Sequence, residues 1–255
     1  MYLKARLCTC MKASDIIRDA VTQVAGMRQT AAARPALAQA LGAVKRFQAR
    51  RFAGSYADLL ESAQYRGAAR FFLDELYSEK DYSQRDAQFA RIAGALERLF
   101  PQPVVQTAVA LAQLHCLSEE LDLALAQSWA EHAALAEVAR YLTAWRCVAR
   151  RAERNRQLET VLHIGHELDR LTRKPGLRMM LRMMRAPARA AGMNALQQFL
   201  ESGFDTFAAM GGKGDGARSF LATVQSREST LFDLLFDAET VACETEMTRL
   251  LGLAR

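Results

Sequence analysis

Apolar residues recur at helical spacing along nearly the whole chain, and polar residues fill the positions between them. The segment 103–126 is apolar almost all round, which is typical of a helix buried at the centre of a bundle. Alanine, leucine, arginine, glutamine and glutamate dominate the chain, and clusters of β-branched residues are few. We therefore predict an all-α fold without a sheet.

Turn-forming residues divide this pattern into about eight or nine helices of ordinary length. Breaks are predicted at Pro35, Gly54–Ser55, 78–83, 100–103, 174–176, Pro187 and 211–216. No period of roughly 20 to 50 residues repeats, which disfavours a solenoid. The expected architecture is an irregular multi-helix bundle. Residues 11–255 are predicted to form a single helical domain, with 175–255 as a candidate C-terminal subdomain.

Residues 1–10 lack a helical pattern that joins the following segment, so we expect a loose N-terminal extension. A metal or redox role for Cys8 and Cys10 would require a second cysteine pair, and none follows. The odd total of five cysteines in a chain of this length indicates reduced thiols. No apolar run approaches the roughly 18 residues of a membrane-spanning helix, and we predict a cytoplasmic protein.

The chain has 255 residues, 51% of them hydrophobic and 24% charged, which is the composition of a globular protein with a substantial core. Its net charge of +6 is small for this length, so nucleic acid is not a favoured partner. The basic residues are concentrated, because no acid lies between Asp169 and Glu201. The cations of that interval are Arg170, Arg173, Lys174, Arg178, Arg182, Arg185 and Arg189.

Four of these arginines recur at i, i+4, i+7 and i+11, which places them on one side of a straight helix. This arginine stripe consists of Arg178, Arg182, Arg185 and Arg189. Pro187 is expected to end or kink the helix at Arg185. The methionines interspersed with the stripe are expected to pack in the core.

Three interpretations of the arginine stripe stay open. It is a face that binds a protein partner or an anion such as nucleic acid, a helix on a membrane surface, or one side of an internal ladder of ion pairs. We favour the ladder, because three acids near the C-terminus have the same spacing as arginines of the stripe. These acids are Asp233, Asp237 and Glu244.

His115, Glu119 and Asp122 share one face of the apolar segment 103–126, at i, i+4 and i+7. Polar side chains on a largely buried helix must be paired or bound to something. One interpretation is a hydrogen bond between the histidine and a carboxylate, with an arginine partner from a neighbouring helix. The alternative is a metal- or ligand-binding site built from these three residues, and the sequence identifies no cofactor for it.

A second group of candidate metal ligands lies on one helical face and comprises Glu159, His163, His166 and Glu167. That face points away from the apolar stripe of its helix, whereas a metal site in a bundle points inward. We therefore predict a solvated charged face. No catalytic serine motif and no phosphate-binding loop is present, so no catalytic residue is assigned.

Three segments, FFLDELYSEKDYSQRD (71–86), LSEELD (117–122) and the stretch 184–212, together resemble an uncharacterised family of helical proteobacterial proteins. The resemblance covers most of the chain after Met11, and it implies a helical fold but no chemistry. Within the first segment, Ser83 and Asp86 have the spacing of a capping box at a helix N-terminus. We predict a helical binding or regulatory module of unknown ligand, with a protein or an anionic ligand as candidate partner, rather than a recognisable enzyme.

Overall fold

The computed structural model describes residues 11–211 and 214–254. Within them all regular structure is helical and no strand occurs, which confirms the predicted all-α fold. The helices are α1 (Ala13–Ala32), α2 (Pro35–Ser55), α3 (Ala57–Glu61), α4 (Arg66–Glu75), α5 (Ser83–Leu99), α6 (Gln102–Glu131), α7 (Glu137–Val148), α8 (Arg151–Thr172), α9 (Leu177–Met183), α10 (Arg185–Ala190), α11 (Asn194–Gly211), α12 (Gly216–Asp237) and α13 (Thr240–Leu253). The predicted extension, with Cys8 and Cys10, lies outside the described residues.

The predicted number of eight or nine helices is too low. Most of the predicted breaks do separate consecutive helices, but further breaks occur where no glycine or proline announces them. Between α7 and α8 the chain turns at Ala149, which adopts a left-handed φ of 50°. The predicted break near Pro187 falls at Met184, and Pro187 itself lies in the first turn of α10.

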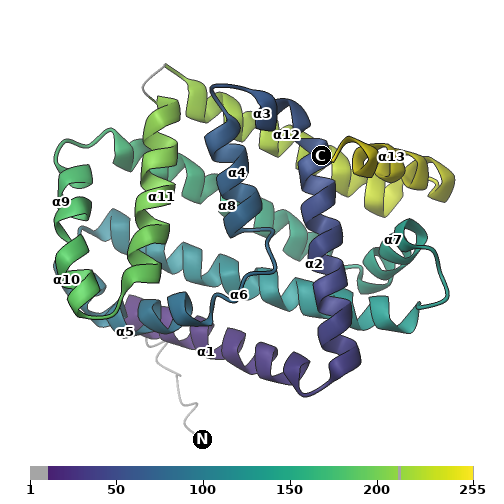
Figure 1. Ribbon diagram of the computed structural model, residues 1–255, viewed down its shortest axis with the longest axis horizontal. Helices are drawn as coiled ribbons and strands as arrows, with labels where there is room; N and C mark the ends of the chain where they lie inside the picture. The colour runs from purple at the N-terminus through teal and green to yellow at the C-terminus, as the bar shows by residue number, and fades with distance from the viewer. Residues whose placement is uncertain (1–10, 212–213, 255) are drawn as a thin grey trace, which may run out of the picture.

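Two sets of helices cross each other in the molecule (Figure 1). Helices α2, α4 and α11 run side by side across a second set that includes α1, α6, α8 and α12. The longest helix, α6, packs against α1, α2, α7 and α8. These neighbours surround it, as its nearly all-round apolar sequence requires.

Buried apolar side chains form three clusters. The first joins α2, α6, α7, α12 and α13 around Trp145. The second joins α2, α3, α4, α8, α11 and α12 around Phe220, and the third joins mainly α1, α5 and α6 around Phe89. Charged and amide side chains are also buried, among them Gln48, Arg51, Asp86, Glu119, Arg154 and Glu228. Burial of ionisable groups is costly unless they are paired or bound, so their partners indicate where a site lies.

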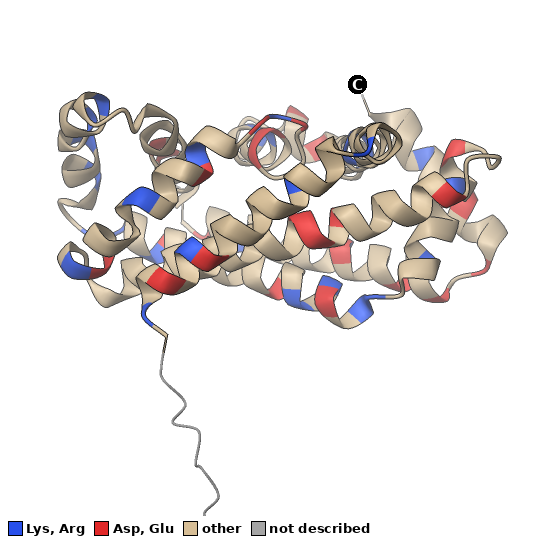
Figure 2. Ribbon diagram, turned by 90° about the horizontal axis from the view of Figure 1, so that it is seen from below, with Lys and Arg blue, Asp and Glu red and all other residues tan. Residues whose placement is uncertain are grey.

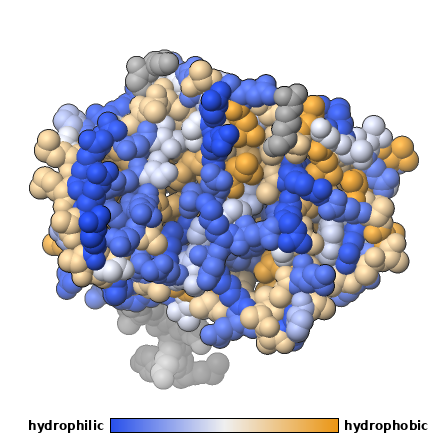
Figure 3. All heavy atoms as spheres, in the orientation of Figure 1, coloured by the Kyte–Doolittle hydropathy of each residue, from blue (hydrophilic) through white to orange (hydrophobic). Residues whose placement is uncertain are grey.

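The surface is mixed in charge and mostly hydrophilic. Acidic and basic residues both occur over the molecule (Figure 2), although α2, α9 and α10 carry only basic and α6 and α11 only acidic charged residues. On the face in Figure 3, hydrophobic side chains gather towards the end of the molecule that carries α13, where Val241 is 76% exposed. Of the described helices, none is long and apolar enough to cross a membrane. The three described cysteines, Cys116, Cys147 and Cys243, are free.

Candidate functional site

A cavity of about 130 Å³ lies where the three apolar clusters meet. Its lining includes Trp145 from the first cluster, Phe52 from the second and Phe89 from the third. Residues of the segment 75–82 contribute to its lining, and one of them, Leu76, is 38% exposed. An engineered apolar cavity of about 150 Å³ holds benzene, so a cavity of this size has room for a small organic molecule.

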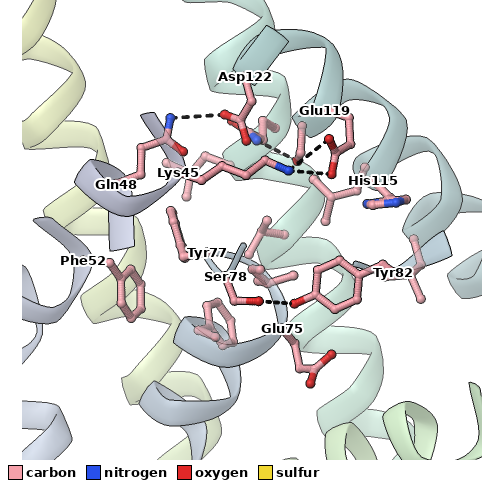
Figure 4. Close-up of a pocket in the computed structure, with 18 of the residues that line it drawn as sticks. Lys45, Gln48, Phe52, Glu75, Tyr77, Ser78, Tyr82, His115, Glu119 and Asp122 are labelled. Carbon is pink, nitrogen blue, oxygen red and sulfur yellow. Dashed lines mark hydrogen bonds and ion pairs between the residues drawn. The ribbon is translucent and has the colours of Figure 1, made fainter. Parts of the chain in front are cut away.

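Polar side chains from several helices line this cavity together with the apolar ones. Figure 4 shows Lys45 and Gln48 reaching from α2 towards α6, with Tyr77 and Tyr82 on the opposite side. The ionisable and amide residues of the lining are Lys45, Gln48, Arg51, Glu75, Tyr77, Tyr82, Arg85, Asp86, His115, Glu119, Asp122, Tyr141, Arg154, Gln157 and Glu228. A cavity between apolar clusters with several convergent polar groups has the composition of a small-molecule site.

His115 lies in a network with Asp86 of α5 and Arg28 of α1. The Nε2 atom of His115 is 2.9 Å from Oδ2 of Asp86, and Nη1 of Arg28 is 2.8 Å from the same oxygen. Burial alone would raise the pKa of Asp86, but the hydrogen bond from His115 and the charges of His115 and Arg28 hold it below its usual value. The predicted histidine–carboxylate bond with an arginine partner is thus present, and Asp86 supplies the carboxylate.

The predicted capping box at Ser83 is wrong, because the Asp86 side chain belongs to the His115 network. Helix α5 begins after Tyr82, which makes no side-chain capping bond. The backbone N–H of Ser83 donates instead to Oδ1 of Asp81, at 2.9 Å.

Glu119 and Asp122 face the same cavity as His115, but each has a different partner. The Nζ atom of Lys45 is 2.9 Å from Oε1 of Glu119, and Nε2 of Gln48 donates to Oδ1 of Asp122 at 3.1 Å. Burial raises the pKa of Asp122, and the charges of Lys45 and Arg154 offset this only in part. Across the described residues, no group of three or more His, Cys, Asp or Glu side chains is arranged to hold a metal ion.

Substituting His115 with alanine is expected to lower the free energy of unfolding by about 1 to 3 kcal/mol, because Asp86 loses a hydrogen-bond partner while it stays buried. Urea unfolding followed by circular dichroism measures the change. His163→Ala is the control, since His163 is exposed and its loss is expected to change stability by less than about 0.5 kcal/mol. Equal stability of the two variants would show that the His115 network contributes nothing to the fold.

On the α12 side of the cavity, a buried ion pair joins Arg51 to Glu228. The Nη1 atom of Arg51 is 2.5 Å from Oε1 of Glu228, and the hydroxyl of Tyr56 donates to the same oxygen at 2.9 Å. Both charged residues are 5% exposed. The spacing of polar residues along the chain predicts no partner for Glu228, so this pair is a contact that sequence reasoning missed.

The cavity also contains polar residues that the sequence analysis did not single out, chiefly Lys45, Arg51 and Arg154. A signal for some of them exists in the sequence. Arg154 precedes Leu158 and Leu162 at i+4 and i+8, so it continues an apolar stripe. Glu228 likewise lies between buried positions of α12 at helical spacing. A charged residue inside an apolar stripe therefore marks a buried polar site better than spacing among polar residues does.

The arginine stripe does not form the predicted ladder with the C-terminal acids. Arg178 binds Asp205 of α11, with its Nε atom 2.8 Å from Oδ1, and Arg185 forms a two-pronged ion pair with Glu201 of the same helix. The predicted acids Asp233 and Asp237 bind Arg151 of α8 instead. The ladder prediction named the wrong partner helix for the arginine stripe, because α11, rather than α12, packs against α9 and α10.

The remaining members of the stripe are exposed. Arg182 and Arg189 make no ion pair with any described residue. The prediction that the interspersed methionines pack in the core is also wrong, since Met179 is 68% and Met183 is 69% exposed. The short helix α9 has no buried residue, and within it only Leu177 and Leu181 are of intermediate burial.

The face with Glu159, His163 and His166 points to solvent, as predicted. These three residues are exposed, and the fourth member of the predicted face, Glu167, is half-buried and pairs with Arg170. Leu162 and Gly165 of the same helix are buried. The helical period alone was sufficient to separate these two faces of α8.

One comparison with known proteins matches most of the chain. Residues 27–242 match the family model described as Domain of unknown function (DUF8198). No curated protein and no solved structure matches the chain. Every charged residue of the cavity lining lies inside the matched range.

Proposed function

The chain belongs to the family of the Domain of unknown function (DUF8198), and from this premise we propose that it is a helical binding module that holds a small organic molecule in its central cavity. Membership of this family agrees with the predicted resemblance to an uncharacterised family. The family description assigns no ligand, so the proposal rests on the chain's own residues.

The observation that carries the proposal is the charged lining of a cavity at the junction of three apolar clusters. Packing alone would favour apolar side chains there, because a buried ion pair is often no more stable than apolar residues of equal volume. Charged and polar groups that line a cavity can instead orient a bound molecule. The segment 75–82 lines the cavity and contains the exposed Leu76, so we propose that a ligand enters there.

Two other interpretations have less support. A metal site at His115, Glu119 and Asp122 would need these side chains to converge on one point, whereas their nearest partners are Asp86, Lys45 and Gln48 respectively. The arginine stripe offers little free charge for binding an anion or nucleic acid. Asp205 and Glu201 neutralise two of its arginines, so only two are left exposed without an ion-pair partner among the described residues.

Filling the cavity tests the proposal. Ala112 is buried and lines the cavity, so Ala112→Leu is expected to raise the free energy of unfolding by about 0.5 to 2 kcal/mol. Small aromatic compounds are expected to raise the melting temperature of the parent protein by mass action but not that of the variant. Differential scanning fluorimetry measures both. A destabilised variant, or an equal response of both proteins to the compounds, would contradict the proposal.

We further propose that residues 11–255 act as one domain in the cytoplasm. The packing of α12 on α8 and of α13 on α2 supports one unit rather than a separate C-terminal subdomain at 175–255. The free thiols of the described cysteines support a reducing compartment.

A further inference from the structure

Three buried side chains of the cavity lining have donors without a strong acceptor. The Nε–H of Arg51 and the Nε1–H of Trp145 have no hydrogen-bond partner among the described residues, although both residues are 5% exposed. Arg154 is 6% exposed and donates only to Oε1 of Gln157, at 3.2 Å. A buried donor without an acceptor costs free energy. Two such donors, together with a buried guanidinium that has one long hydrogen bond to an amide, indicate that something else supplies acceptors in this cavity.

Arg154 differs from the other buried cations of the cavity because it has no carboxylate partner. Lys45 pairs with Glu119 and Arg51 pairs with Glu228, but among the described residues no acid lies within ion-pair distance of Arg154. Burial lowers its pKa, and the charge of Asp122 compensates only in part. The cavity therefore contains a buried guanidinium that has no carboxylate within ion-pair distance among the described residues.

Arg154 and Trp145 lie next to each other. The guanidinium carbon of Arg154 is 4.4 Å from the centroid of the Trp145 ring. The planar guanidinium fork is suited to binding the two oxygens of a carboxylate, and the indole N–H adds a further donor. This corner of the cavity is thus complementary to an acceptor group with negative charge.

The acids of the lining do not prevent an anion from binding there. Glu228 is neutralised by Arg51, Glu119 by Lys45, and Asp86 by Arg28. Glu75 pairs with Arg85. Asp122 accepts a hydrogen bond from Gln48, and burial raises its pKa. Arg154 is the cation that remains without an ion-pair partner in the described lining.

The rest of this corner is aromatic. Tyr141 and Phe232 line the cavity, and both have ring contacts with Trp145, at centroid distances of 5.8 and 6.0 Å. Flat apolar rings pack well against such walls. We infer that the ligand is a small aromatic carboxylate, whose carboxylate group accepts hydrogen bonds from Arg154 and from the indole N–H of Trp145 at the edge of their stacked pair, and whose ring lies against the aromatic side chains. This inference rests on the proposed function.

Benzoate tests the ligand class, with benzamide and toluene as neutral probes of similar shape. Each is titrated into the full chain by isothermal titration calorimetry. Benzoate is expected to bind about ten- to 100-fold more tightly than benzamide, because the charged carboxylate forms the stronger hydrogen bonds to the guanidinium. Benzamide binding as tightly as benzoate would overturn the inference.

Arg154→Met is expected to weaken benzoate binding by about ten- to 100-fold and to leave toluene binding nearly unchanged. Arg156→Met is the matched control on the exposed face of the same helix, and it is expected to leave both affinities unchanged. Trp145→Phe keeps an aromatic ring but removes the indole N–H, and a severalfold loss of benzoate affinity is expected because that donor binds the carboxylate. Trp145→Phe also provides a second test should Arg154→Met fail to fold.

The outcomes separate this inference from the proposed function. Toluene binding without benzoate binding would overturn the carboxylate ligand and leave a cavity that binds small molecules. Equal benzoate affinity of the parent, Arg154→Met and Trp145→Phe would overturn the position of the carboxylate. If benzoate, benzamide and toluene all failed to bind at millimolar concentration, the proposed function would be overturned together with the inference.

Discussion

Replacing Glu228 with glutamine is expected to lower the free energy of unfolding by about 3 to 5 kcal/mol, because it leaves Arg51 charged and buried without a counter-ion. Burial alone would lower the pKa of Arg51, but the nearby charge of Glu228 raises it, so the guanidinium is charged in the folded protein. The loss is large because Nη1 of Arg51 is 2.5 Å from the glutamate oxygen and both side chains are buried. Urea unfolding of the parent and variant measures it.

Two further variants distinguish loss of the charge pair from loss of packing. The double variant Arg51→Met with Glu228→Leu removes both charges, and it is expected to recover most of the stability lost in Glu228→Gln. Tyr56→Phe removes only the second hydrogen bond to Glu228, and a loss of about 1 kcal/mol is expected. If Glu228→Gln were as stable as the parent, the pair would have to be solvated rather than buried.

Gly54→Ala is expected to destabilise the protein by about 3 kcal/mol or more, since the helices cannot accept an extra methyl group at this position. A Cβ atom at Gly54 of α2 would lie 1.8 Å from the backbone oxygen of Leu250 in α13. The contacting atom belongs to the main chain, so no rotamer change can relieve the overlap and α13 must move. Thermal melting measures the loss.

Gly26→Ala is the matched control for this prediction. Gly26 lies inside α1 and is exposed, and a Cβ atom added there would meet no atom within 4 Å beyond its own stretch of helix. Alanine is the better helix former by about 0.5 to 1 kcal/mol, so this variant is expected to be slightly more stable than the parent. Similar melting temperatures for the two alanine variants would show that α13 does not pack closely on α2.

Much of the local structure follows from the sequence, because helical periodicity is a local property. The apolar segment 103–126 becomes part of the central helix α6, and the face with His163 and His166 becomes solvent-exposed. His115 lies on a buried helix and is paired with Asp86, as expected for a polar residue at such a position. Such statements need only the spacing of side chains along one helix.

The number of helices was less predictable. Glycine and proline indicate a helix break in the sequence because of the backbone conformations that they favour. Helices α7 and α8, however, separate at Ala149, which adopts the left-handed conformation although alanine does not favour it. Packing around Trp145, rather than the preference of alanine, is what can hold such a conformation. Breaks of this kind leave no trace in composition.

The partners of charged residues were decided by the tertiary structure alone. Asp233 and Asp237 have the spacing that matched the arginine stripe, yet they bind Arg151, and the stripe binds acids of α11. Helical spacing tells which residues share a face, whereas the choice of partner depends on which helix packs against that face. That choice is made by the burial of apolar surface over the whole chain, a free energy to which each exposed ion pair adds little. The cavity and its unpaired Arg154 arise in the same way, from the junction of three apolar clusters that no single segment encodes.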